Sequence, residues 1–382
     1  MQRFYPYKLL EEEAQTSDNT TFTKIFPSEG QVSALQMEMK ATNGATSNIA
    51  NLLPECVSSI EIKGDGVDTI LSLDGYALWK YLWAIHGRCP VGSYTEHPGD
   101  GQWMKFVFPF GRWVGDQEFM LNLDKYREVR LDVKYNLATN TAVGATGFVT
   151  GTFGLKLDLL KTLPGVKLAS KGCRRVIERK SFTTTSSGDI SWDFVQDYPY
   201  TAIMPYARFI SMYGDPFANI KLDLGGGKPI LVDRRFDELS YIMADEMNID
   251  TTFIGKYFVK DNDTIVTHGG GNYDCSPVVF NVNSDVDPWY VVHPELWGGD
   301  MVKLGVATFA GAAAPASLGS GIHITARSKH FGLGSLLYIP LCDGPEWTNP
   351  LLPADTKDAQ LIMTQSEASA TGKVLTEQIL PQ

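Results

Sequence analysis

The sequence has few cysteines and few charged residues, and it has no long apolar run. Its five cysteines are far apart and form no Cys-x-x-Cys pair, so we expect neither a disulfide framework nor a structural zinc site. No stretch reaches the roughly 18 apolar residues of a membrane helix, and the start at Met1–Tyr7 lacks the apolar core of a signal peptide. These absences predict a chain that is not exported and that keeps its thiols reduced.

Motifs for catalysis are also missing. The six histidines are scattered, without a His-x-His or His-Glu-x-x-His pair, which argues against a catalytic metal. The segment His268–Gly271 is similar to the oxyanion loop of lipases, but the Gly-x-Ser-x-Gly turn that would carry the nucleophile does not occur. We therefore interpret this segment as a turn, and we expect no enzymatic activity and no cofactor.

One polar segment is a weak candidate for a calcium site. Its oxygen-bearing side chains stand at alternate positions: Asn281, Asn283, Asp285 and Asp287. The glycine and the distal glutamate of an EF-hand are missing, so a polar loop without metal is the main interpretation. Four aromatic residues fit a sugar-stacking platform or, more commonly, a buried interface: Trp289, Tyr290, Trp297 and Trp347.

The balance of charge limits the partners of this chain. Charged residues make up 20% of the sequence and the formal net charge is −11, which argues against a surface built as a whole for nucleic acid. One segment is nevertheless basic, with Glu178 as its single acid, and its cations are Lys167, Lys171, Arg174, Arg175, Arg179 and Lys180. Two interpretations stay open: an inward-facing patch for genome or lipid headgroups, or a solvated linker with ion pairs between subunits.

Strand patterns dominate the rest of the sequence. The 36 glycines and 20 prolines suit many short strands joined by turns. Apolar and polar residues alternate in Leu35–Lys40, in Ile60–Lys63 and in Val129–Leu137, as expected for strands with one buried face. A length of 382 residues favours two domains. Together these features predict an all-β chain of two domains.

The order of elements in the first half recurs in the second. An aspartate opens one amphipathic helix in each half, at Asp74 and at Asp233, and an apolar strand containing a proline follows, at Pro109 and at Pro340. A further strand begins 20 residues after each proline, and these strands are Val129–Tyr135 and Gln360–Thr364. The order predicts a duplicated β-domain with one helix in each copy.

The two copies differ in one loop. From the helix-opening aspartate to the proline there are 35 residues in the first half and 107 in the second. The extra residues lie at about 250–332, between the helix and the proline-containing strand. An insertion of this size at one loop of a β-sandwich is expected to project from one end as a small subdomain.

This arrangement resembles the double jelly-roll major capsid proteins of tailless icosahedral viruses, the lineage that includes adenovirus hexon. The resemblance rests on the duplication and on Phe106–Gly111 leading into Met120–Leu131, and it extends from about Gln31 to Leu380. It implies an all-β fold of two tandem eight-stranded jelly rolls, each with one short helix, with the large insertion in the second. We accordingly expect an N-terminal arm at 1–30, a first jelly roll at 31–165 and a second at 166–382.

The resemblance also implies a function. The chain would be a structural protein that forms pseudo-hexameric homotrimers, which tile an icosahedral shell beside neighbouring capsomers and minor or vertex capsid proteins. It would reside in the virion after assembly in the host cytoplasm, without binding nucleic acid in a sequence-specific way. Two other functions stay open: a carbohydrate-binding or carbohydrate-active β-sandwich protein, and a minor or vertex capsid component on the same fold.

An internal membrane is a further expected partner, because many members of this family enclose one. The contact would be made by the aromatic N-terminal arm, whose relevant residues are Arg3, Phe4, Tyr5, Tyr7, Lys8, Leu9 and Leu10. Packing of the arm on a neighbouring subunit is the alternative.

Overall fold

Strands and two helices make up the part of the chain that the computed structural model describes. Those residues are 3–44, 53–88, 90–93, 99–138, 147–208, 216–247, 336–366 and 368–382, together with the paired backbone of six strands between 252 and 329. The helices are α1 (Gly75–His86) and α2 (Phe236–Glu246), and single 3-10 turns occur at η1 (Leu53–Cys56), η2 (Leu123–Lys125) and η4 (Pro353–Asp355). The prediction of an all-β chain with one helix in each half is confirmed.

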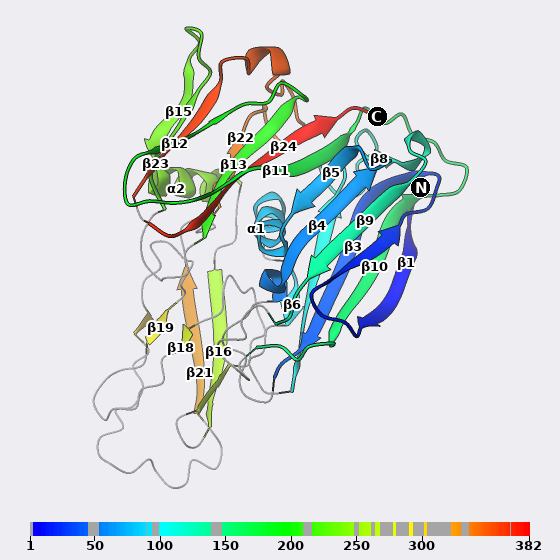
Figure 1. Cartoon of the computed structure of the whole chain (residues 1–382), viewed down its shortest axis with the longest axis vertical. Helices are drawn as coiled ribbons and strands as arrows, with labels where there is room; N and C mark the ends of the chain where they lie inside the picture. The colour runs from blue at the N-terminus through cyan, green and yellow to red at the C-terminus, as the bar shows by residue number, and fades with distance from the viewer. Residues whose placement is uncertain are drawn as a thin grey trace.

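The first half is a sandwich of two sheets (Figure 1). One layer has the order β1–β10–β3–β7–β6, with β8 also paired to β3. The strands of this layer are β1 (Phe4–Gln15), β10 (Phe153–Thr162), β3 (Gln31–Thr42), β7 (Gly101–Pro109), β6 (Gly92–Ser93) and β8 (Leu121–Asn122). The other layer consists of β2 (Thr20–Ile25), β9 (Val129–Tyr135), β4 (Val57–Gly64) and β5 (Asp68–Leu73). Tyr135 of β9 stacks on Phe153 of β10 with ring centroids 4.1 Å apart, so the two layers meet in one core.

The second half is a sandwich of eight strands. One layer is β11 (Cys173–Thr183), β24 (Thr371–Leu380), β13 (Tyr200–Arg208) and β22 (Ile339–Pro340). The other is β12 (Asp189–Asp193), β23 (Gln360–Gln365), β14 (Phe217–Asp223) and β15 (Ile230–Arg235). The rings of Phe182 and Phe217 connect the two layers across the core.

The two sandwiches share one sheet. The layer β2–β9–β4–β5 continues into β11–β24–β13–β22, because β5 pairs in parallel with β11. The parallel ladder is short, with Leu71 opposite Val176 and Ser72 opposite Ile177. The halves are therefore joined by backbone hydrogen bonds as well as by side chains.

The strand pairing confirms the duplication in detail. The layers β1–β10–β3–β7 and β2–β9–β4–β5 of the first half match β11–β24–β13–β22 and β12–β23–β14–β15 of the second, in the same order. Pro109 lies opposite Ala34, and Pro340 lies opposite Ala202 at the corresponding place. A bulge interrupts β1 after Lys8 and β11 after Glu178, so even an irregularity of the strand recurs.

The expected N-terminal arm is wrong for residues 4–25. Residues 4–15 form β1, which pairs with β10, and residues 20–25 form β2, which pairs with β9. Tyr7, Leu9 and Leu10 pack partly against the core of the first sandwich. Burial of these side chains holds the segment in the sheet. Contact of this segment with an internal membrane stays a prediction.

A second correction concerns the helix of the second half. Asp233 lies within β15, where its carboxylate accepts a hydrogen bond from the Asn219 side chain at 2.8 Å. The N-cap of α2 is Arg235, which makes no side-chain capping bond. Asp74, in contrast, caps α1 as expected: its carboxylate accepts from the backbone amide of Ala77 at 2.6 Å.

The insertion expected at about 250–332 lies outside the residues whose side chains are described. Two small sheets are recorded there by backbone pairing, with the orders β17–β16–β21 and β18–β19–β20. Their strands are β16 (Thr252–Lys260), β17 (Thr264–Thr267), β18 (Val278–Val279), β19 (Tyr290–Val292), β20 (Val302–Lys303) and β21 (Ile322–Lys329). The calcium candidate Asn281–Asp287 and the turn His268–Gly271 also lie outside the described residues.

The two aspartates give a matched test of helix capping. We expect Asp74→Ala to lower the free energy of unfolding by about 1–2 kcal/mol, because α1 loses its cap and a partner of Lys373. Asp233→Ala should cost less than about 0.5 kcal/mol, because this exposed side chain caps no helix. Urea unfolding of both variants measures the difference, and equal losses would contradict the assignment of Asp74 as the cap.

Candidate functional site at the junction of the two sandwiches

Helix α1 lies between the two sandwiches (Figure 1). Its residues from Gly75 to Ala84 are all buried, and Gly87 ends it in the left-handed conformation with φ 66°. One face packs on β4 and β7 of its own sandwich. On the other face the ring of Tyr76 lies 6.2 Å from that of Tyr206 in β13. The helix is thus covered on both sides, by the first copy and by the second.

A buried acidic side chain stands at the centre of this junction. Glu377 of β24 is 0% exposed, and its carboxylate accepts hydrogen bonds from the hydroxyl groups of Tyr81 in α1 and of Thr201. The hydroxyl of Tyr338 lies 3.4 Å from the same carboxylate. The guanidinium of Arg174, which is 3% exposed, approaches it to 3.8 Å. The first copy therefore supplies one hydroxyl donor, and the second copy supplies the charges.

The tyrosines of this cluster keep their protons. Burial, with a contribution from the charge of Glu377, raises the pKa of Tyr81 and of Tyr338 well above the usual range, so both hydroxyls remain donors. Burial alone would lower the pKa of Arg174, but the charge of Glu377 together with the neighbouring Tyr81 and Tyr338 outweighs it, and the pKa is raised. The cluster holds the sandwiches together, and neither tyrosine nor Arg174 exchanges a proton near neutral pH.

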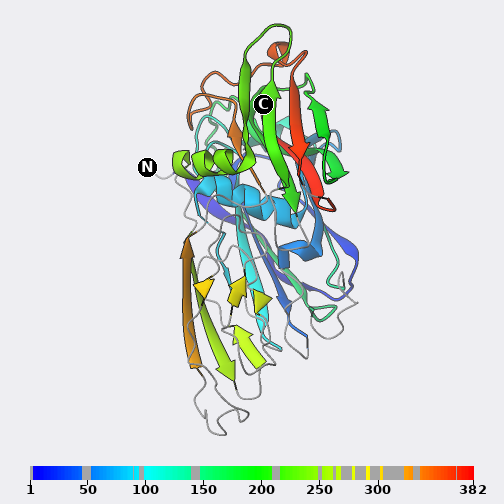
Figure 2. The same ribbon diagram turned by 90° about the vertical axis from the view of Figure 1, so that its left-hand side faces the viewer.

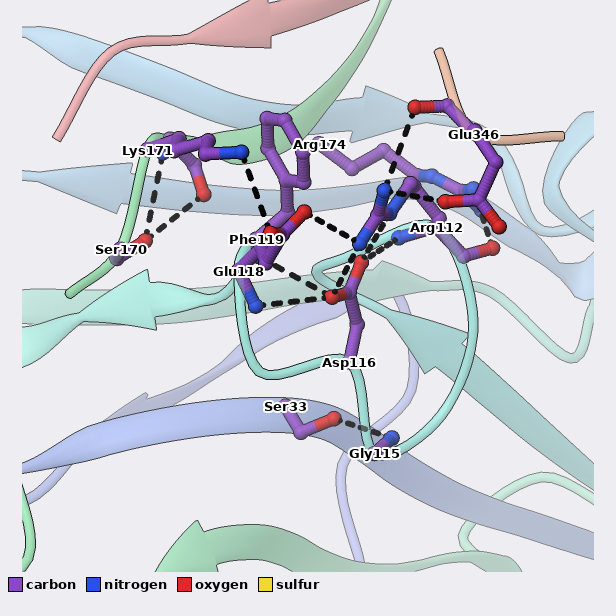
Figure 3. Close-up of polar contacts among 11 residues, drawn as sticks. Ser33, Arg112, Gly115, Asp116, Glu118, Phe119, Ser170, Lys171, Arg174 and Glu346 are labelled. Atoms are coloured by element: carbon purple, nitrogen blue, oxygen red, sulfur yellow. Dashed lines mark hydrogen bonds and ion pairs between the residues drawn. The ribbon is translucent and has the colours of Figure 1, made fainter. Parts of the chain in front are cut away.

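A second ionic group closes the same junction at its edge (Figure 3). Arg112 follows β7, and its guanidinium donates to both carboxylate oxygens of Asp116, at 2.8 and 3.0 Å. It also donates to Glu118 at 2.9 Å and to Glu346 of the second sandwich at 2.6 Å. Burial alone would raise the pKa of Asp116, but hydrogen bonds from Arg112 and from backbone amides hold it below the usual range. A bidentate pair of this kind fixes both position and angle.

Arg174 connects the two ionic groups. It donates to the backbone carbonyl of Arg112 at 3.0 Å, and its guanidinium lies 5.1 Å from the ring centre of Trp347. Phe119 packs edge-on against the same ring, with centroids 5.1 Å apart. Trp347 is therefore a buried part of the junction, which agrees with the main interpretation of this residue and not with the sugar-stacking alternative.

Comparisons with known proteins identify the architecture. No protein-family model and no curated protein matches the sequence. Among solved structures, the chain is similar to the major capsid protein of STIV, the Sulfolobus turreted icosahedral virus, with a TM-score of 0.59 and 10% identity over 100% of this chain and 97% of that one. It is similar to the major capsid protein P2 of bacteriophage PM2 with a TM-score of 0.52 and 9% identity, over 99% and 98% of the two chains.

The fold is that of the double jelly-roll capsid proteins. At this level of identity the similarity establishes the fold and carries no residue roles. The predicted resemblance is confirmed, and the two sandwiches are its two jelly rolls. The junction described above is accordingly the contact between the first and the second jelly roll of one chain.

The basic segment predicted from the sequence is mostly a strand of the second jelly roll. Arg174 is buried, so its inclusion in an exposed patch is wrong. Arg175 and Arg179 both donate to Asp197, at 2.8 and 2.5 Å, so this one carboxylate offsets part of their positive charge. Lys180 donates to the carbonyl of Ser191.

The first two cations of this segment are more exposed than the others. Lys167 pairs with Asp124 at 3.0 Å, and Lys171 pairs with Glu118 at 3.3 Å. Ion pairs at such exposed positions contribute little stability. That Lys171 and Lys180 face the genome or lipid headgroups stays a prediction.

Two absences hold for the described part of the molecule. No group of three or more histidine, cysteine or acidic side chains placed to hold a metal ion occurs among the described residues. Within those residues, no helix has the length and apolar character needed to span a membrane. The site that the structure does present is the ionic junction.

Sequence patterns did not point to Tyr81, Arg112, Asp116 or Glu377. Glu377 lies in the apolar strand Val374–Leu380, and a charge within such a strand is the signal that was available. Its pairing could not be found from that signal, because Tyr81 and Glu377 are 296 residues apart.

The buried pair can be tested by removing one charge and then both. We expect Glu377→Leu to lower the free energy of unfolding by about 3–5 kcal/mol, because Arg174 is left charged and buried without its partner. Adding Arg174→Met should recover most of that loss, since no buried charge remains. Urea unfolding followed by tryptophan fluorescence measures both. A double variant as unstable as the single one would contradict this account of the cluster.

The hydrogen bonds of Asp197 make the free energy of unfolding depend on pH. Burial alone would raise its pKa, but hydrogen bonds from Arg179, Gln378 and Arg175 lower it to about 2. The unfolded value is about 3.9, so the stabilisation is complete above about pH 4 and is lost as the pH falls towards 2. We expect the unfolding free energy of the wild type to fall more steeply across this window than that of Asp197→Asn. The control Glu29→Gln, at an exposed turn, should follow the wild type.

Proposed function

We propose that this chain is a capsid protein whose function is to assemble, as a homotrimer, into the shell of an icosahedral virus. The double jelly-roll fold, shared over the full chain with major capsid proteins of two viruses, supports the proposal. The observation that carries it is the fixed junction between the jelly rolls. A shared sheet, a buried ion pair and the Arg112 cluster hold the two copies as one rigid body. A tile must keep its shape in this way when it is surrounded by neighbours.

Duplication explains how such a tile fills a hexagonal position. Two similar jelly rolls in one chain present six similar wedges in a trimer, which gives the outline of a hexamer. The neighbouring capsomers and the minor or vertex proteins would then contact the outer edges of these wedges. The place of this protein would be the virion.

A structural role also fits the chemistry of the junction better than catalysis does. The buried tyrosines keep their protons, and the guanidinium of Arg112 donates to three carboxylates. The rival function, a carbohydrate-binding β-sandwich, loses Trp347 from its expected aromatic surface. Only the capsid function uses both jelly rolls and the rigid contact between them.

Mass measurement and imaging of the expressed chain test this proposal. We expect native mass spectrometry to give three times the 42.2 kDa mass of the chain, and electron microscopy to show particles with a six-sided outline. The trimer should persist at micromolar concentration, because capsomers form before they join a shell. A monomer that binds glycans on an array would contradict the capsid function and favour the rival.

A further inference from the structure

Helix α2 has exposed apolar side chains, among the described residues, on the face that corresponds to the covered face of α1. Leu239 and Met243 of α2 are buried, at 9% and 4% exposure, whereas Tyr241 and Ile242 are 49% and 37% exposed. The neighbouring strand β15 adds two exposed apolar side chains, Ile230 and Leu231. Figure 2 views this end of the molecule, with α2 in front. We call Ile230, Leu231, Tyr241 and Ile242 the α2 face.

The first copy shows what the covered form of this face looks like. Asp74 and Arg235 are the N-caps of α1 and α2, so Tyr81 and Ile242, each seven residues further on, occupy the same position of the helix. Tyr81 is 0% exposed because β24 of the second jelly roll lies against it. The corresponding Ile242 has no such layer over it within the described part of the chain.

The layer that covers α1, β11–β24–β13–β22 of the second jelly roll, has a counterpart in the first jelly roll. It is the layer β1–β10–β3–β7, which lies on the opposite side of the molecule from α2 (Figure 1). The strand register equates single positions. Val176 lies opposite Glu377, and Pro6 lies opposite Leu160 at the same distance from the recurring bulge, so Leu160 takes the place of Glu377.

The same register assigns two more positions. Phe4 takes the place of Arg174, because each lies two residues before the strand position just equated. Val107 takes the place of Tyr338, because each precedes its proline by two residues. We call Phe4, Val107 and Leu160 the β10 face. Leu160 and Val107 are partly exposed, and Phe4 is nearly buried.

Comparison of the two faces shows a coordinated change in chemistry. Within the chain, Tyr81 meets Glu377, Arg174 and Tyr338, and all four are polar. Every counterpart is apolar, and the four counterparts are Ile242, Leu160, Phe4 and Val107. An apolar helix face and an apolar sheet face therefore occur at the two free ends of the molecule, in positions related as the two sides of the internal junction.

We propose that the α2 face of one protein chain docks on the β10 face of a second, identical chain, with Ile242 of the first in contact with Leu160 of the second. This inference rests on the proposed function and names the residues of its subunit contact. The two faces are different and lie at opposite ends, so the contact is head-to-tail and closes into a ring when the rotation between copies fits. Burial of the exposed apolar side chains of the two faces supplies the driving force.

The backbone at this contact differs from that of the internal junction. The charges along it are mixed, because the register places the exposed Arg234 beside Lys8, whose ammonium group pairs with Glu11. Pro6 stands where Val176 pairs with β5 in the internal junction, and it has no amide hydrogen to donate. The contact between copies is therefore made by side chains rather than by continuation of the sheet.

Disruption and rescue of the trimer test this contact. We expect Ile242→Asp and Leu160→Lys, each alone, to weaken the trimer about 100-fold or more, because each buries an unpaired charge in an apolar contact. The double variant should recover most of the affinity, since the two new charges meet each other. Native mass spectrometry across a dilution series measures the change. Val67→Asp, at an 82% exposed turn that belongs to neither face, is the matched control and should behave as wild type.

Two further measurements distinguish a loss of association from a loss of folding. Thermal unfolding of the single variants should resemble that of wild-type monomer, since both side chains are partly exposed. Oxidation of the pair Ile242→Cys and Leu160→Cys should give a covalent link between copies that neither single cysteine gives. If Ile242→Asp alone and Leu160→Lys alone each still form trimers of wild-type affinity, the docking geometry is overturned while the capsid function stands. A wild-type chain that stays monomeric would overturn both.

Discussion

The buried carboxylate of Glu377 is the constraint on which the rest of the structure depends. A buried charge needs partners close by, and here hydroxyl donors come from β13, α1 and the segment before β22, while the guanidinium of Arg174 in β11 lies 3.8 Å away. These elements belong to both jelly rolls, so the carboxylate is satisfied only when the rolls stand in one relative position. The short parallel ladder between β5 and β11 and the Arg112 cluster then fall into register at the same junction.

The two junction chemistries also distinguish right from wrong pairing. If Tyr81 met Leu160, its buried hydroxyl would have no acceptor, and if Ile242 met Glu377, the carboxylate would lose a donor. Each mismatch leaves a buried polar group without a partner, whereas in the matched pairs polar groups meet polar groups and apolar groups meet apolar groups. A chain with two similar jelly rolls needs such a difference, because otherwise the rolls of different copies could exchange places.

Part of this structure could be predicted from the sequence. Local signals sufficed for α1, whose cap is Asp74, and for the strands that contain Pro109 and Pro340, because capping and alternation act over a few residues. They failed for β1, where Pro6 and three glutamates hide an edge strand, and for Asp233, whose place in β15 is set by pairing with β14. Glu377 could not be recognised, because its partners are assembled only by the fold.

The order of assembly accounts for the placement of polar and apolar contacts. The internal junction forms between parts of one chain, so its partners are held close and the desolvation of Glu377 and Arg174 is completed during folding. A contact between copies forms from solution, where burial of a charge pair would raise the cost of every encounter. Apolar faces such as Ile242 and Leu160 release water on contact and leave no charge unmet. An ion pair inside each tile and apolar contacts between tiles therefore let rigidity be established first and association follow.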